Sequence, residues 1–330
     1  MKVKIGIVGL GRMGERHINA YSAIEGVEIA GLYDADKALM EQVSRQYRIP
    51  CFNSLEHLIE SDIDALNVCI PTYLHHEAIL KALQSGKHVF CEKPLTHKLE
   101  YAQEIKRVAE EYGKIVMVGY LNRFHPAFEL LKEVLDKGII GIPYYALFRI
   151  GGRGGHRAWK HRADKGGGAI LDMLTHMLDL ALFYFGEPAE VTSLFSDTVL
   201  KERFIDGEKV QVDAEDCVFV RMRTKEGMQI FLQADLITPS FMNTVEVHGD
   251  NGSFFGSLMP LFPTIIYCKE PRDIYAQGEN VLNLQAANLI EKELRYFVDC
   301  VTGSDSPRDM VEDSMQVLKV IEEVRRQQNG

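Results

Sequence analysis

The sequence predicts an α/β domain with a doubly wound parallel sheet, followed by an α+β domain with a large, mostly antiparallel open sheet. Over the first 120 residues, short apolar runs alternate with segments of helical spacing, which is typical of βαβ units. Beyond residue 121, strand-like runs recur without long helices and are separated by turn signals such as Asn251-Gly252. We therefore expect two domains, residues 1–120 and residues 121–330.

The strands of the first domain are expected to be continuous apolar runs, because parallel strands are buried on both faces. Such runs occupy residues 3–8, 27–33, 65–70, 88–91 and 115–119. The segments between them with helical spacing are residues 12–23, 38–47, 74–84 and 99–112. The alternation predicts one parallel sheet with helices on both faces.

The second domain begins with a predicted helix at 127–135 and a strand at 144–150. A stretch rich in Gly and Arg, residues 151–168, then leads into a helix at 169–185. The strand-like runs that follow are residues 190–196, 216–223, 228–234, 244–248, 253–257 and 264–268, and two helices, 286–301 and 309–326, close the chain. This order predicts one large open sheet.

A glycine motif, Gly9-Leu10-Gly11-Arg12-Met13-Gly14, ends the first predicted strand and opens a helix. In that context GxGxxG is the fingerprint of a dinucleotide-binding Rossmann domain, in which the pyrophosphate rests on the helix N-terminus. Asp34 lies twenty residues past Gly14, where a carboxylate accepts hydrogen bonds from the adenosine ribose. Because Asp34 and Asp36 would repel a 2′-phosphate, we expect NAD as the cofactor rather than NADP.

The overall composition excludes several classes of function. The chain has 37 Lys and Arg against 47 Asp and Glu, a formal charge of −10, so we expect no nucleic-acid partner. No apolar run approaches the roughly 20 residues that span a bilayer, and the N-terminus lacks the features of a secretion signal. The six cysteines form no CxxC pair, so we expect free thiols, no metal site and a cytoplasmic protein.

Four motifs in order make the sequence resemble the glucose–fructose oxidoreductase, inositol dehydrogenase and MocA family. They are the GxGxxG, a Pro-x-x-x-His at Pro71–His75, a Glu-Lys-Pro at residues 92–94, and an Asp-x-x-x-His at Asp172 and His176 after a Gly-rich segment. One departure is Leu174, where family members often carry Gly. The resemblance covers essentially the whole chain and implies a nicotinamide-dependent oxidoreductase that acts on a sugar, a cyclitol or a nucleotide sugar.

The resemblance also implies roles for individual residues. The cofactor-binding residues it adds to the glycine motif and Asp34 are Pro71, Thr72, His75, Glu92, Lys93 and Arg123. Those expected to bind substrate are Lys93, Tyr120, Arg153, Trp159, Asp172 and His176, of which Lys93, Asp172 and His176 are the catalytic candidates.

The chemistry of these three residue types fits alcohol oxidation. Asp172 and His176 are four residues apart on a predicted helix, so their side chains share one face. His176 is the candidate acid/base because an imidazole changes charge near neutral pH, and Lys93 can polarise the reacting oxygen. A Lys desolvated beside the cofactor is a competing base. Asp172 would position a substrate hydroxyl or the imidazole.

Positive charge concentrates just before the predicted catalytic helix. Residues 121–175 hold nine basic and five acidic residues, and the cluster comprises Arg149, Arg153, Arg157, Lys160, Arg162 and Lys165. Arg side chains suit phosphate or carboxylate recognition, so the cluster could bind an anionic substrate; a solvated loop or a contact between subunits is the alternative.

Two other functions share this fold and remain open. One is a glycosidase that oxidises and re-reduces a sugar carbon to eliminate its substituent, and the other is a cofactor-sensing regulator without catalysis. The resemblance also implies that the open sheet packs against a second subunit, as a homodimer or homotetramer.

Overall fold

The computed structural model describes residues 2–152, 158–163, 166–205, 207–239, 243–259, 261–308 and 310–328. The chain forms two compact units: unit 1 is Met1–Leu121 with Asn288–Met315, and unit 2 is Asn122–Ala287 with Gln316–Gly330. The first break lies next to the expected boundary at residue 120. Residues 288–315, however, fold with the first unit and not with the second domain as we expected.

Unit 1 is built on a five-stranded parallel sheet of order β2-β1-β3-β4-β5. The strands are β1 (Val3–Val8), β2 (Val27–Tyr33), β3 (Ala65–Val68), β4 (His88–Glu92) and β5 (Val116–Gly119). The predicted doubly wound parallel sheet is confirmed. The chain order reverses between β1 and β3, and in sheets of this kind ligands bind outside the carboxyl ends of the strands at that point.

The helices of unit 1 follow the strands in sequence. They are α1 (Arg12–Ser22), α2 (Lys37–Tyr47), α3 (Leu55–Glu60), α4 (His75–Gln84) and α5 (Leu99–Tyr112), with a short 3-10 turn at Thr72–Leu74. The short α3 was not expected; Ser54 caps it by accepting a hydrogen bond from the amide of His57. The late helix α8 (Leu289–Thr302) packs against α1, and its Phe297 lies edge-on to Phe90 of β4.

Unit 2 contains an eight-stranded sheet of order β15-β14-β13-β12-β6-β11-β10-β7. Its strands are β6 (Pro143–Gly151), β7 (Glu190–Asp197), β10 (Cys217–Arg223), β11 (Gln229–Asp235), β12 (Thr244–Gly249), β13 (Gly252–Ser257), β14 (Thr264–Cys268) and β15 (Gly278–Leu282). Only the β6–β11 pair is parallel, so the expected mostly antiparallel sheet is confirmed. The edge strand β15 and the hairpin of β8 (Glu202–Ile205) and β9 (Glu208–Gln211) were not expected.

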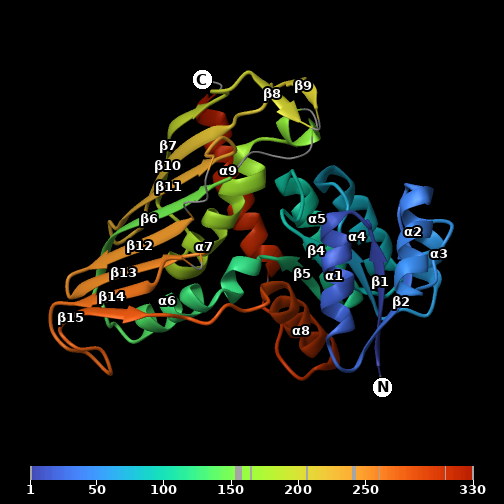
Figure 1. The fold of residues 1–330 in the computed structure, drawn as a ribbon, viewed down its shortest axis with the longest axis horizontal. Coiled ribbons are helices and arrows are strands. Elements are labelled where there is room, and N and C mark those ends of the chain that lie inside the picture. Colours follow the sequence, from blue (N-terminus) through green and yellow to red (C-terminus); the bar gives the residue numbers. More distant parts are fainter. Residues whose placement is uncertain are drawn as a thin grey trace. The chain divides into compact units, whose positions relative to one another are not determined.

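Helices cover one face of this sheet (Figure 1). They are α6 (Pro126–Asp136), α7 (Thr175–Phe185) and α9 (Met310–Gln328), whose apolar side chains form one core with the inward-facing residues of the strands. The first turn of the expected helix at 169–185 is a π-helical turn, Ile170–Leu174, that runs directly into α7.

The opposite face of the sheet carries large apolar side chains that remain accessible. Phe195 on β7 and Phe219 on β10 are cross-strand partners and are 43% and 40% exposed, and Tyr267 on β14 is 46% exposed. In the described part of the chain no helix covers this face (Figure 1). None of the described helices is long and apolar enough to cross a membrane.

Candidate active site

The glycine motif folds into a loop that only glycine permits. Gly9 has φ +87°, and a Cβ built on it would lie 2.6 Å from the backbone of Cys69, the residue after β3. A Cβ on Gly14 would lie 2.0 Å from the carbonyl oxygen of Gly9. Gly11, the N-cap of α1, provides no capping side chain, so the amides of the first turn have no side-chain acceptor there. The loop therefore brings bare backbone and a helix N-terminus to the switch point of the sheet, as a pyrophosphate requires.

Asp34 lies at the end of β2 and its carboxylate faces the same loop. Its Oδ2 accepts a hydrogen bond from the amide of Leu10 at 2.7 Å, and its Oδ1 accepts one from the amide of Asp36 at 2.8 Å. Asp36 itself caps α2 by accepting hydrogen bonds from the amides of Ala38 and Leu39. Asp34 is thus fixed beside the glycine loop, and both acids keep negative charge where a 2′-phosphate would have to bind.

His75 joins the two loops that follow β3 and β4. It is 1% exposed; Nε2 lies 2.8 Å from the carbonyl oxygen of Ile70, and Nδ1 lies 3.0 Å from that of Pro94. Burial lowers the pKa of His75 below its ordinary value, although the backbone carbonyls oppose that shift. Pro71 and the buried Thr72 shape the same turn before α4. His75 therefore holds the loops together, and its ring nitrogens are committed to backbone.

Glu92 ends β4, and Lys93 follows it at the carboxyl edge of the sheet. The Lys93–Pro94 peptide bond is cis, which the sequence does not decide. Glu92 is buried and its Oε1 lies 3.0 Å from Nε2 of His17. Burial raises the pKa of Glu92, but the hydrogen bond and charge of His17, with Lys93, outweigh burial and hold that pKa below its ordinary value. Glu92 is therefore a buried carboxylate that is held by His17 next to Lys93 in the chain.

Two predicted site residues, Tyr120 and Arg123, contact other side chains of their own unit. Tyr120 is 1% exposed, and its hydroxyl lies 2.8 Å from Oγ of Ser314, which itself donates to the carbonyl of Met310. Arg123 is buried and its Nε donates to both carboxylate oxygens of Asp179, at 3.1 and 3.0 Å. Tyr120 therefore fastens the start of α9 within unit 1 and Arg123 forms a buried ion pair within unit 2, while the expected binding of substrate by Tyr120 and of cofactor by Arg123 stays a prediction.

Asp172 and His176 lie on one helical segment of unit 2, as expected. Asp172 is inside the π-helical turn and His176 is in the first turn of α7. Single π turns within helices are rare and occur frequently at functional sites. Lys160 donates to both oxygens of Asp172, at 2.6 and 2.8 Å, and so holds this carboxylate in a fixed orientation.

The glycines before this segment have a packing reason. A Cβ on Gly167 would lie 2.4 Å from the carbonyl oxygen of Lys160, and one on Gly168 would lie 2.2 Å from the carboxylate of Glu215. Glu215 accepts a hydrogen bond from the amide of Ile170 and so occupies the start of the helical segment. A helix N-terminus favours an anion, and here a carboxylate of the protein itself already occupies it. Leu174, the departure from the family pattern, is fully buried in the core.

The described part of the basic cluster is largely neutralised by carboxylates. Lys160 pairs with Asp172, and Arg162 pairs with Asp213 at 3.2 Å. Arg149 lies on β6 with its side chain on the face of the sheet that the helices leave open. The half-buried Trp159 is beside Lys160, whose ammonium lies 5.8 Å from its ring centre. Arg153, with Arg157 and Lys165, lies outside the described residues.

Comparison with known proteins decides the family. Residues 3–120 match the model described as "Oxidoreductase family, NAD-binding Rossmann fold", and residues 128–255 match the "GFO/IDH/MocA C-terminal domain". The chain belongs to the Gfo/Idh/MocA family of oxidoreductases. Its amino-terminal unit is therefore the NAD-binding domain of that family, and the geometry of Gly9, Gly14 and Asp34 fits the dinucleotide.

Two named relatives match three quarters or more of the chain. The scyllo-inositol 2-dehydrogenase (NAD(+)) of Bacillus subtilis is 31% identical over 93% of this chain and 88% of its own length. The inositol 2-dehydrogenase of Rhizobium meliloti is 30% identical over 77% of this chain and 75% of its own. The structure of a levoglucosan dehydrogenase in complex with NADH and L-sorbose superposes with a TM-score of 0.89 at 22% identity, covering 99% and 97% of the two chains, which shows that this Gfo/Idh/MocA protein shares its fold.

Gly9→Ala tests the cofactor loop against a matched control. Gly9 and Gly26 have similar positive φ angles, +87° and +81°, but a Cβ on Gly26 meets nothing within 4 Å. Both variants should lose about 1 kcal/mol of stability through backbone strain, and Gly9→Ala should lose more because its Cβ clashes with the backbone of Cys69. Only Gly9→Ala should weaken NADH binding, by roughly tenfold or more, because its Cβ must displace the backbone at Cys69. Fluorescence titration with NADH measures this, and equal affinities would contradict the proposed role of the loop.

Sequence reasoning missed two residues of this Gfo/Idh/MocA protein. In the sequence Lys160 stands out only as one charge of the basic cluster. In the structure it donates a hydrogen bond to the candidate catalytic Asp172. Glu293, on α8, is 1% exposed in unit 1, whereas its segment was expected in the second domain. An acidic residue within the apolar stripe of a predicted helix was the available signal for Glu293.

Proposed function

We propose that this protein is an NAD-dependent dehydrogenase that acts on a secondary hydroxyl of a neutral cyclitol or sugar. The observation that carries the proposal is that one chain holds a dinucleotide loop in unit 1 and, on a helical segment of unit 2, the carboxylate of Asp172 and the imidazole of His176. The names of the relatives that span most of the chain support the substrate class, since both are inositol dehydrogenases.

The chemistry divides between residues of this chain and the cofactor. The bound nicotinamide supplies the acceptor for the hydride that leaves the carbinol carbon. His176 takes the hydroxyl proton as the carbonyl forms, and returns a proton in the reverse direction. Lys93 polarises the oxygen. Asp172, oriented by Lys160, accepts a hydrogen bond from a substrate hydroxyl.

Ion pairing favours a neutral substrate over an anionic one. Lys160 and Arg162, two described cations of the basic cluster, have carboxylate partners in Asp172 and Asp213. A phosphate or carboxylate substrate would have to displace those partners to reach the cations. Neutral polyols, which bind through hydroxyl hydrogen bonds, need no such exchange.

A substrate screen tests the proposal directly. The purified protein is mixed with inositols, neutral sugars or nucleotide sugars and with NAD or NADP, and reduced cofactor is followed by absorbance. We expect NADH to accumulate with NAD and neutral polyols, and NADPH to accumulate more slowly when NADP replaces NAD, because of Asp34. Release of an aglycone without net NADH would favour the oxidation–elimination glycosidase. Cofactor binding without turnover on any class would favour the regulator.

We also propose that the open face of the eight-stranded sheet joins two copies of the chain. Phe195, Phe219 and Tyr267 place accessible aromatic surface on this face, and exposed apolar patches of this kind mark interfaces. Phe219→Glu should therefore yield a smaller assembly in light scattering. The matched control is Phe204→Glu on β8, a residue that is 79% exposed but lies outside the large sheet. A monomeric wild-type protein, or equal effects of both variants, would contradict the proposal.

A further inference from the structure

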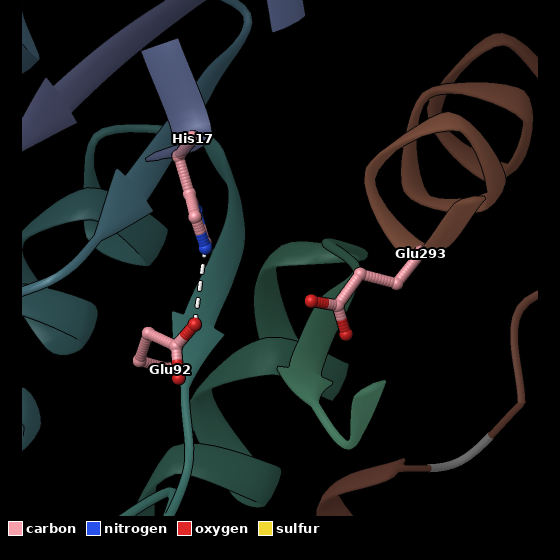
Figure 2. Close-up of side chains that lie close together, drawn as sticks. All are labelled: His17, Glu92 and Glu293. Atoms are coloured by element: carbon pink, nitrogen blue, oxygen red, sulfur yellow. Dashed lines mark hydrogen bonds and ion pairs between the residues drawn. The ribbon is translucent and has the colours of Figure 1, made fainter. Parts of the chain in front are cut away.

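Three buried titratable side chains gather in unit 1 behind the residue that ends β4. His17 comes from α1, Glu92 from the end of β4 and Glu293 from α8, and they are 0%, 8% and 1% exposed. Their nitrogen and oxygen atoms all lie within 4.8 Å of one another. Figure 2 shows the carboxyl group of Glu293 turned toward the other two side chains. Three titratable groups buried this close together must share their protons.

The proton positions on His17 follow from its neighbours. Nδ1 lies 3.0 Å from Oδ1 of Asn67, and this oxygen also accepts a hydrogen bond from the hydroxyl of Tyr21. The amide nitrogen of Asn67 faces Sγ of Cys69, at 3.2 Å, which fixes the orientation of the amide. Nδ1 therefore carries a proton, and a second proton lies in the 3.0 Å contact between Nε2 and Glu92.

That second proton belongs mainly to the imidazole. Burial lowers the pKa of His17, but Cys69 and Glu92 outweigh burial and raise it well above its ordinary value. The pKa of Glu92 is held below its ordinary value, as described above. We assign the larger effect on His17 to Glu92, because a carboxylate oxygen at 3.0 Å is a better partner than a thiol at 3.5 Å. His17 and Glu92 thus form a buried ion pair.

Glu293 cannot be a second carboxylate in this place. Neither of its oxygens has a hydrogen-bond partner among the described residues, and an ionised carboxyl group buried without donors is costly. Burial and the charge of Glu92 raise the pKa of Glu293 well above its ordinary value, while His17 and Arg16 oppose this only partly. The titratable and charged groups around it are Arg16, His17 and Tyr21 of α1, Cys69 after β3, and Glu92 with Lys93 at the end of β4. Glu293 is therefore a neutral acid with one O–H to donate.

We propose that Glu293 is a positioning residue that donates its carboxyl proton, through a bridging water, to the Glu92 carboxylate and so fixes the backbone that carries Lys93. The geometry gives Glu92 a hydrogen-bonded neighbour in His17 from α1 and a second polar neighbour, the carboxyl group of Glu293 from α8, within 4.8 Å. Glu92 and Lys93 are adjacent in the chain. Fixing the carboxylate of Glu92 therefore also fixes the peptide unit from which the side chain of Lys93 extends. The effect on turnover rests on the proposed role of Lys93; the protonation of Glu293 does not.

The first experiment measures protonation without any substrate. The free energy of unfolding of the wild type and of Glu293→Gln is measured by urea titration across pH. A group with a raised folded pKa stabilises the fold below its unfolded pKa, and this contribution is lost as pH rises through the folded value. Glu293→Gln cannot ionise, so its stability relative to the wild type should increase as pH rises. Glu291→Gln on the same helix, whose carboxylate faces solvent and pairs with Arg295, serves as control and should show no such increase. A pH-independent difference for Glu293→Gln would overturn the proposal.

The second experiment separates positioning from packing and from metal binding. Glu293→Gln keeps a donor and should retain turnover within about threefold, whereas Glu293→Met keeps volume without a donor and should lose roughly tenfold in kcat with unchanged NADH affinity. Equal, unimpaired turnover of both variants would overturn the proposal. So would stabilisation of the wild type, but not of Glu293→Gln, by added Zn²⁺ alone, since the three side chains would then form a cation site.

Discussion

Replacing His176 by glutamine is expected to lower kcat by about 10²–10⁴-fold, because the amide can neither take nor return the hydroxyl proton. The first turn of α7 holds this side chain, and glutamine keeps comparable bulk there. Affinity for NADH should change by less than about threefold, since the dinucleotide loop belongs to the other unit. Steady-state turnover and fluorescence titration with NADH measure the two quantities separately.

His57→Ala is the matched control for this prediction. His57 is an exposed residue of α3 that the proposed chemistry does not use, so its removal should leave kcat and NADH affinity unchanged. If His176→Gln instead weakened NADH binding and kept its turnover per bound cofactor, the acid/base assignment would be wrong. Lys93, the competing base, would then be the next candidate.

Asp179→Asn is expected to destabilise the protein by about 3–5 kcal/mol, because it leaves the guanidinium of Arg123 buried without its counter-charge. The two side chains are 2% and 1% exposed, and the guanidinium also stacks on the ring of Phe183 at 4.7 Å. Urea titration gives the change in the free energy of unfolding. The exposed pair of Arg45 and Glu41 is the control, and Glu41→Gln should change stability little.

A double replacement distinguishes a structural ion pair from a cofactor ligand. The variant with Arg123→Met and Asp179→Leu removes both charges together and should be more stable than Asp179→Asn alone. It should also bind NADH with an affinity close to that of the wild type. A large loss of NADH affinity in the double variant would support the predicted role of Arg123 in cofactor binding.

The parallel sheet and the dinucleotide loop were predictable because their signals are local. The apolar run at β1, the glycines that follow it and Asp34 all lie within one βαβ unit, where spacing alone fixes their relation. The Asp172 and His176 pair was likewise predictable from a separation of four residues. Its π-helical turn was not, since Ile170–Leu174 has the same apolar spacing as an ordinary helix.

The features that could not be predicted depend mostly on contacts between residues that are far apart in the sequence. Tyr120 forms a hydrogen bond with Ser314 almost 200 residues later, and Arg123 pairs with Asp179 across 56 residues. Local sequence patterns cannot indicate partners this distant. The edge strand β15 and the hairpin of β8 and β9 are short and polar, with too little alternation to stand out. The assignment of α8 to unit 1 depends on its packing against α1, which no local signal encodes.

Because the chain returns to unit 1 at residue 288, this unit cannot be completed until late in synthesis. The cofactor-binding unit begins at the N-terminus, but its last elements, including α8, are residues 288–315. During synthesis, α1 emerges almost 270 residues before the helix that covers it, and the second unit is nearly complete by then. Both units are therefore complete only near the end of synthesis, although the strands of the dinucleotide-binding unit leave the ribosome first. A chain cut short after residue 287 would display the uncovered surface of α1 to cellular proteases.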